Sequence, residues 1–148
     1  MQGPSARQYE ELEQCPHFAL TEQILAAAYK VHTALGPGYV EKIYENALVR
    51  ALNKLGLQVG QQVKYPVLFE GELVGQHVMD LVVDSKVYVE LKVVELTSLE
   101  RAQTISGLKA SGIEIALLLN FNTLHLKNQV DRLLNPDILR TFKSQRKS

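Results

Sequence analysis

The sequence predicts an α/β (α+β) fold in which helices pack against one mixed central sheet. Helical periodicity runs through residues 20–55, and strand-like runs separated by short turns follow over residues 63–94. A capped helix and an almost entirely apolar run come after them. Short turns join antiparallel strands, whereas a helix between two strands allows a parallel pair. The predicted core order is therefore helix, three strands, helix, strand.

The first predicted elements are two amphipathic helices. Residues 20–35 carry apolar side chains at helical spacing, and Thr21 is the expected N-cap. The stretch "GPG", residues 36–38, ends this helix because proline and glycine break the hydrogen-bond ladder. A second helix is expected over residues 40–55, with Gly56 as its C-terminal stop. Its predicted apolar face consists of Ile43, Ala47, Ala51 and Leu55.

Three strand-like runs follow the second helix. Apolar and polar side chains alternate over residues 63–69, where Pro66 favours an edge strand because it lacks an N–H group. The stretch "EGE", residues 70–72, is a turn, and it leads into a second run over residues 73–83. A third run covers residues 87–94. The three runs therefore predict an antiparallel meander.

Two acids lie inside the second and third runs. If "DSK", residues 84–86, is a three-residue hairpin turn, counting outward sets Asp80 directly opposite Glu90, with Lys92 two residues further on. Opposed side chains in an antiparallel pair are about 5 Å apart at Cβ, where like charges repel. A cation or a shared proton relieves such a pair, and carboxylate oxygens are ligands that Mg²⁺ or Mn²⁺ take.

A purely structural interpretation of these charges competes with the metal site. The pattern D-x9-E-x-K occurs often by chance, and edge strands carry charges on their solvated faces. Taken alone, the three residues favour that interpretation. The surrounding apolar side chains favour strands in the middle of the sheet instead, where charge needs a partner.

The last part of the sequence predicts a helix and one buried strand. Thr97 and Glu100 have the spacing of a capping box for a helix over residues 98–110, and Gly112 ends it. The run "IEIALLLNF" is apolar on both faces, as in a buried strand. A short strand around Leu124 and Leu126 and a final helix in "NQVDRLL" are also expected.

Length and composition indicate one soluble domain. We expect a domain over residues 19–135, a loose leader over residues 1–18 and a basic tail over residues 136–148. Sixteen basic and sixteen acidic side chains leave no overall basic field, so a nucleic-acid site must be a local patch. Cys15 is the only cysteine, which excludes a disulfide framework. The N-terminus lacks a signal-peptide core, and no apolar run is long enough to cross a bilayer, which predicts a cytoplasmic protein without membrane contact.

Three further residues become candidate site residues only when they are considered together with Asp80 and Glu90. Glu41 and Tyr44 share a face of the second helix, where an acid also simply suits the helix dipole. Gln103 lies in the third helix, where a solvent-facing glutamine is common. However, "GYVEKIY", residues 38–44, fits the signature G-x-x-E-x-x-Y. Over residues 18–135 the chain resembles the GxxExxY family of the PD-(D/E)XK nuclease superfamily.

The resemblance implies a restriction-endonuclease-like core: helix, three-stranded antiparallel meander, helix, strand. It implies that Glu41 is the acid of the first core helix and that Asp80, Glu90 and Lys92 are the motif's aspartate and E-x-K. The implied metal ligands are Asp80, Glu90 and Glu41, and the implied ion is Mg²⁺ or Mn²⁺. The implied catalytic residues are Lys92, Glu41 and Gln103.

Two positions of the third helix depart from the pattern that the resemblance implies. The nuclease branch resembling RecB-type exonucleases often has a tyrosine four residues after the glutamine, where this chain has Gly107. Family members commonly have a histidine three residues before it, where this chain has Glu100. Tyr44 is expected either to stack or to support Glu41.

The expected function is metal-dependent hydrolysis of phosphodiester bonds in nucleic acid, with DNA favoured over RNA. One alternative is a catalytically weak or inactive nuclease-fold protein that acts as a nucleic-acid-binding or regulatory module. Another is a structural or assembly protein in which the acids hold a structural ion. A homodimer is also expected, because one small domain offers little surface to grip a duplex.

Overall fold

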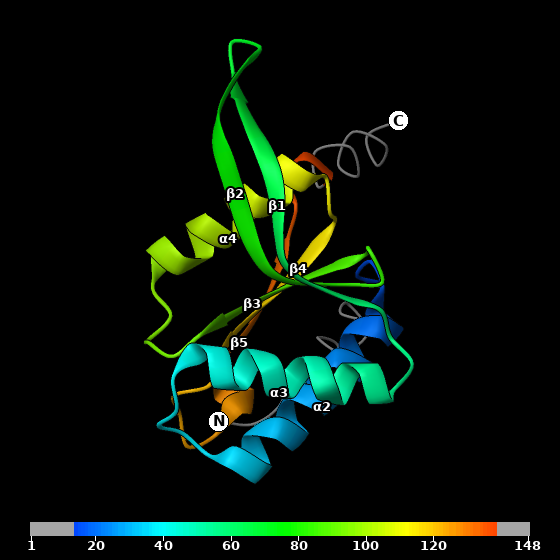
Figure 1. Cartoon of the computed structure of the whole chain (residues 1–148), viewed down its shortest axis with the longest axis vertical. Helices are drawn as coiled ribbons and strands as arrows, with labels where there is room; N and C mark the ends of the chain where they lie inside the picture. Colours follow the sequence, from blue (N-terminus) through cyan, green and yellow to red (C-terminus); the bar gives the residue numbers. More distant parts are fainter. Residues whose placement is uncertain (1–13, 139–148) are drawn as a thin grey trace.

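A five-stranded mixed sheet forms the centre of the computed structural model, which describes residues 14–138 (Figure 1). Its strands are β1 Val59–Phe69, β2 Glu72–Val83, β3 Val87–Lys92, β4 Ile115–Asn120 and β5 Val130–Leu134, in the spatial order β1-β2-β3-β4-β5. Only β3 and β4 run parallel, and the other neighbouring strands are antiparallel. The predicted α/β class is confirmed, because this arrangement is consistent with a restriction-endonuclease-like core.

Helices cover both faces of the sheet. The helices α2 Phe18–Leu35 and α3 Glu41–Lys54 pack on one face, and α4 Ser98–Ser111 packs on the other (Figure 1). A short 3-10 helix, η1 Leu126–Gln129, precedes β5. Within residues 14–138, no helix combines the length and the apolar character that a membrane span requires. Each face of the sheet therefore has its own apolar cluster, and the larger one lies under α2 and α3.

The helix α4 supplies the crossover that the parallel pair of β3 and β4 requires. The predicted capping box is confirmed: the Thr97 side chain accepts from the backbone of the first turn, and the Glu100 carboxylate accepts from the Thr97 N–H at 2.8 Å. Gly112 ends the helix with a left-handed backbone, as predicted. Glu100 thus has a structural use as part of the N-terminal cap of α4.

Two details of the N-terminal helices differ from the predictions. The helix α2 begins three residues before Thr21, whose hydroxyl donates to the Phe18 carbonyl at 2.9 Å instead of capping the helix. In α3 the predicted apolar face is only partly correct: Ala47 and Ala51 pack against the core, but Ile43 is 42% exposed and Leu55 is 54% exposed. The face that meets the sheet consists of Tyr44, Glu45, Leu48 and Leu52.

The C-terminal part also differs from its prediction. The segment predicted as a helix, "NQVDRLL", contains the end of η1 and strand β5, and the segment around Leu124 and Leu126 is not a strand. The reason is tertiary: β5 pairs antiparallel with β4, which satisfies the second edge of that buried strand. The predicted leader and tail fall largely on residues 1–13 and 139–148, which lie outside the described residues.

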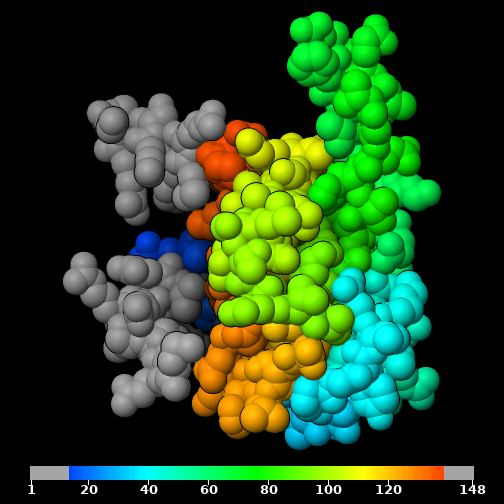
Figure 2. All heavy atoms as spheres, turned by 90° about the vertical axis from the view of Figure 1, so that its left-hand side faces the viewer, coloured from blue at the N-terminus to red at the C-terminus, as the bar shows by residue number. Residues whose placement is uncertain are grey.

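The hairpin of β1 and β2 projects beyond the rest of the molecule (Figures 1 and 2). It can do so because β2 pairs with β3 only over residues 81–83, so most of β2 separates from the sheet together with β1. As predicted from Pro66, β1 is an edge strand. Large apolar side chains are exposed near the tip, among them Leu68, Phe69, Leu73 and Val74.

Candidate metal centre

The predicted acids lie at the fork where β2 separates from β3. Val83 pairs with Val87, as the hairpin count predicted, and the ladder ends two pairs further on. The same register would set Asp80 opposite Glu90 at the next position, where the two strands no longer pair. At this point the Leu91 N–H donates to the Asp80 Oδ2 at 2.9 Å, so a side-chain acceptor replaces the backbone of β2.

Three carboxylates converge at this fork. Oxygen atoms of Glu41, Asp80 and Glu90 all lie within 4.8 Å of one another. Asp80 is 8% exposed and Glu90 is 9% exposed, while Glu41 is half-buried at the start of α3. Three hard oxygen donors at this separation fit a Mg²⁺ or Mn²⁺ ion, which also takes water and phosphate oxygens.

The electrostatics of the cluster favour a cation. Burial and the neighbouring Asp80 raise the pKa of Glu90 to about 9. Burial and Asp80 also raise the pKa of Glu41, an effect that Lys92 opposes. Both shifts reflect charge that lacks sufficient compensation. A divalent cation bound between the oxygens would stabilise all three carboxylates in the charged form.

Lys92 lies beside the acids. Its Nζ is 3.8 Å from the Glu90 Oε1, and its side chain is partly exposed. Both residues are on β3, two positions apart, so their side chains share one face of the sheet. The Lys92 ammonium group therefore lies at a partly exposed edge of the acid cluster, where solvent can reach it.

Two other residues predicted for the site, Tyr44 and Gln103, do not lie within the acid cluster. Tyr44 is fully buried, stacks on Phe121 and donates its hydroxyl to the Gly36 carbonyl at 2.5 Å. It thereby ties the "GPG" turn to the start of α3, which carries Glu41. Gln103 is exposed on α4, and within residues 14–138 its side chain forms no hydrogen bond to the acids. The structure thus brings the three acids and Lys92 together and leaves Gln103 outside the cluster.

Tyr88 is a site residue that the sequence reasoning missed. Its ring is buried under α4, and its hydroxyl donates to the Glu90 Oε2. A Cβ atom at Gly107 would come within 2.7 Å of both the Tyr88 ring and the His77 ring. Gly107 therefore leaves the space that these two rings fill, and a larger side chain at this position would collide with both of them. The spacing of Tyr88 and Glu90, two residues apart in a strand, was the available signal.

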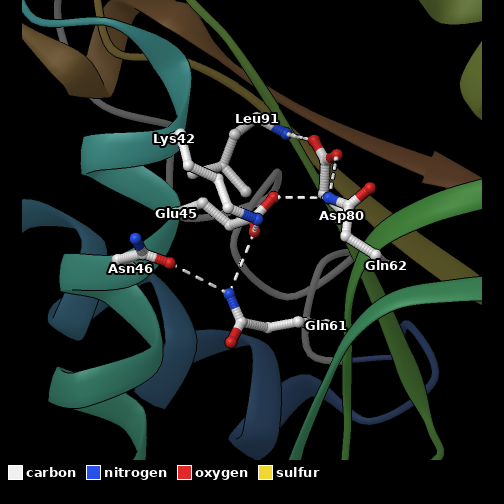
Figure 3. A network of polar contacts seen from close by, with 7 residues as sticks. All are labelled: Lys42, Glu45, Asn46, Gln61, Gln62, Asp80 and Leu91. Carbon is white, nitrogen blue, oxygen red and sulfur yellow. Dashed lines mark hydrogen bonds and ion pairs between the residues drawn. The ribbon is translucent and has the colours of Figure 1, made fainter.

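A polar network next to the cluster was also missed (Figure 3). Glu45 is only 2% exposed, and its carboxylate accepts from Lys42 at 2.6 Å and from Gln61 at 2.9 Å. Gln62 donates to Glu45 at 2.7 Å and to Asp80 at 3.3 Å. Glu45 lies one helical turn after Glu41, a spacing that indicated a shared face.

The fold and the site together define a restriction-endonuclease-like core with an acidic cluster at its strand fork. The family model of the PD-(D/E)XK nuclease superfamily matches residues 19–133, and the chain belongs to this superfamily. Members of the superfamily are generally nucleases and typically use divalent metal ions. No curated protein sequence and no solved structure matches this chain significantly.

Metal binding is expected to strengthen as the pH rises towards 9. Because Glu90, with its pKa of about 9, is protonated at neutral pH in the metal-free protein, binding must displace a proton. The apparent Mn²⁺ affinity should then rise about tenfold per pH unit below that pKa. Calorimetric titrations at about pH 6.5 and about pH 8.5 measure this, and equal affinities would contradict it.

The same group makes the stability of the metal-free protein depend on pH. The folded-state pKa of Glu90 is above its unfolded value, so the folded state holds the extra proton between about pH 4.5 and about pH 9. The free energy of unfolding that this group contributes therefore falls as the pH rises through that window. Stabilisation by Mn²⁺ should accordingly be larger at the alkaline end, which thermal unfolding with and without the ion can test.

Proposed function

We propose that this protein is a metal-dependent nuclease that hydrolyses phosphodiester bonds in nucleic acid, with DNA favoured over RNA. The observation that carries the proposal is the convergence of three carboxylates within 4.8 Å with Lys92 beside them. Membership of the PD-(D/E)XK nuclease superfamily supports it. The proposed site residues are those predicted from the sequence.

In this proposal Asp80, Glu90 and Glu41 would hold the Mg²⁺ or Mn²⁺ ion. The ion, when bound, would polarise the phosphate and lower the pKa of a water molecule. Lys92 orients the attacking water or stabilises negative charge on the phosphate as a fixed cation. Gln103 contacts the substrate from the exposed side of α4, and Tyr44 supports Glu41 by fixing the start of α3.

Further assignments belong to the same proposal. The signature in residues 38–44 supports membership of the GxxExxY family, and we place the protein in the cytoplasm. Two copies form a homodimer, and the exposed apolar side chains of the β1–β2 tip support this. Glu70 and Glu72 at the tip make a phosphate backbone an unfavourable partner there. Sedimentation velocity of the purified protein would test for the dimer.

The test is a cleavage assay with labelled single- and double-stranded DNA and RNA. We expect cleavage with Mg²⁺ or Mn²⁺, none with excess EDTA, and a faster reaction on DNA. Substrates labelled at either end, compared with circular substrates, would separate end-directed from internal cutting. Absence of cleavage with both ions on all four substrates would contradict the proposal.

A second candidate function is a nucleic-acid-binding or regulatory module with weak or no catalysis. The observation that favours it is the position of Gln103, exposed and without a hydrogen bond to the acids in the described part of the chain. Such a module would retard nucleic acid in a gel in the presence of Mn²⁺ without cutting it. Retardation without cleavage in the same assay would therefore select this function.

A further inference from the structure

The backbone of β1 is distorted opposite Asp80. Gln61 pairs with Leu81 and Val63 pairs with Met79, so the register sets Gln62 opposite Asp80. Gln62 itself forms no ladder pair, and its φ of +52° is in the left-handed region. Between Val59 and Val67, where the register is constant, the distortion therefore affects one residue, at the position that faces the candidate metal centre.

This conformation is unfavourable for a glutamine. A Cβ atom clashes with the backbone at positive φ, and residues other than glycine that adopt it are mainly asparagine, aspartate and histidine. Strained residues of this kind persist only where surrounding contacts hold them, and they cluster at functional sites. The contacts that hold Gln62 are therefore informative.

The side-chain amide of Gln62 links two carboxylates on different elements (Figure 3). Its Nε2 donates to the Glu45 Oε1 of α3 at 2.7 Å and to the Asp80 Oδ1 of β2 at 3.3 Å. A glutamine amide has two N–H donors, one for each acceptor, and carries no charge of its own. The other Asp80 oxygen accepts from Leu91, so protein donors contact both of its oxygens.

We propose that Gln62 is a positioning residue of the metal centre. It orients the Asp80 carboxylate and connects β2 to α3, the helix that also supplies Glu41. The strained backbone at Gln62 is retained because it lets the amide reach both carboxylates. This inference rests on the proposed metal site, since a positioning role presupposes that Asp80 and Glu41 share an ion.

The neighbouring residue Gln61 provides a matched control. Gln61 also donates to Glu45, at 2.9 Å, but it bonds to Asn46 and not to Asp80. Methionine has nearly the shape of glutamine without its donors. Gln62→Met therefore removes the contacts with Asp80 and Glu45, whereas Gln61→Met removes contacts with Glu45 and Asn46 and leaves Asp80 untouched. Gln62→Gly removes the amide and the backbone strain together.

The experiment combines Mn²⁺ calorimetry with thermal unfolding of the metal-free protein and the three variants. Outer ligand contacts typically change metal affinity 10- to 100-fold, so Gln62→Met should lower the Mn²⁺ affinity about tenfold. Gln61→Met should stay within about twofold of the wild type. Gln62→Gly should lose affinity as Gln62→Met does, but its melting temperature should exceed that of Gln62→Met, because both variants lack the amide and only glycine suits the left-handed backbone.

The possible outcomes distinguish failure of the positioning role of Gln62 from failure of the metal site itself. If the wild type binds Mn²⁺ and Gln62→Met binds it equally well, the positioning role is wrong and the metal site stands. An equal loss in Gln61→Met would assign the effect to Glu45 and would also overturn it. If the wild type binds no Mn²⁺, the metal site fails and the inference fails with it. A melting temperature of Gln62→Gly at or below that of Gln62→Met would contradict the strain at this position.

Discussion

Asp80→Asn should abolish specific Mn²⁺ binding, lowering the affinity by at least about 100-fold, beyond the usual effect of outer contacts. Asp80 is central to the cluster because its buried carboxylate contributes to the raised pKa of both Glu41 and Glu90. The amide has the same shape, and its oxygen can still accept from the Leu91 N–H, so the fork should keep its structure. Calorimetry at about pH 8 measures the loss directly.

The substitution has a second consequence that a simple folding defect would not produce. Asp80 is a cause of the raised pKa of Glu90, second to burial, so its neutralisation should lower that pKa. The metal-free variant should then lose less stability than the wild type as the pH rises. Asp84→Asn is the matched control, since Asp84 lies in the β2–β3 turn and accepts from the Gln58 N–H at 2.8 Å, away from the cluster. Mn²⁺ affinity within about tenfold of the wild type in Asp80→Asn would place the ion elsewhere.

The hairpin register was predictable because short-range rules determine it. A three-residue turn sets which residues pair, and the alternation of side chains then decides which of them share a face. Counting from the turn therefore predicted that Asp80 and Glu90 lie close together, as the structure shows. The approach of Glu41 was not predictable in this way, because it depends on how α3 packs on the sheet. Only the resemblance to a nuclease family indicated it.

The packing of α3 shows why counting was insufficient there. Both the predicted face and the observed face have apolar side chains at helical spacing, so periodicity does not choose between them. Tertiary contacts decide instead: Tyr44 stacks on Phe121 of the segment after β4, at a centroid distance of 4.8 Å. This orientation also buries Glu45, an acid that no sequence rule would have assigned to an interior position.

The polar contacts of the site were the least predictable part. Gln62 reaches Asp80 through a left-handed backbone, and nothing in the sequence marks a glutamine in a strand for that conformation. Gln103 illustrates the opposite case, because a motif position is present in the sequence but the structure leaves its side chain exposed. The sequence therefore predicted the positions of motif residues on strands. It did not predict the positions of residues that depend on how a helix is rotated or on local backbone strain.

Lys92→Ala should lower the cleavage rate about 10²- to 10³-fold, the usual cost of removing a group that stabilises charge in the transition state. Its Mn²⁺ affinity should change little, because two effects oppose one another. Without Lys92 the pKa values of Glu90 and Glu41 rise, which disfavours the ion, but a neighbouring positive charge is also removed, which favours it.

This pairing of lost cleavage with retained metal binding separates catalysis from the ion's own binding. Lys86→Ala, in the exposed β2–β3 turn, is the control for losing one lysine near the fork. A regulatory module would bind nucleic acid equally in both variants and would have no cleavage to lose. If Lys92→Ala cleaves at the wild-type rate, the lysine has no catalytic role, and the activity must be assigned to other groups or to a contaminating nuclease. Cleavage should be lost in both Lys92→Ala and Asp80→Asn, with Mn²⁺ binding retained in the first variant and lost in the second. That combination would assign cleavage to this site, because a contaminating nuclease would not respond to either substitution.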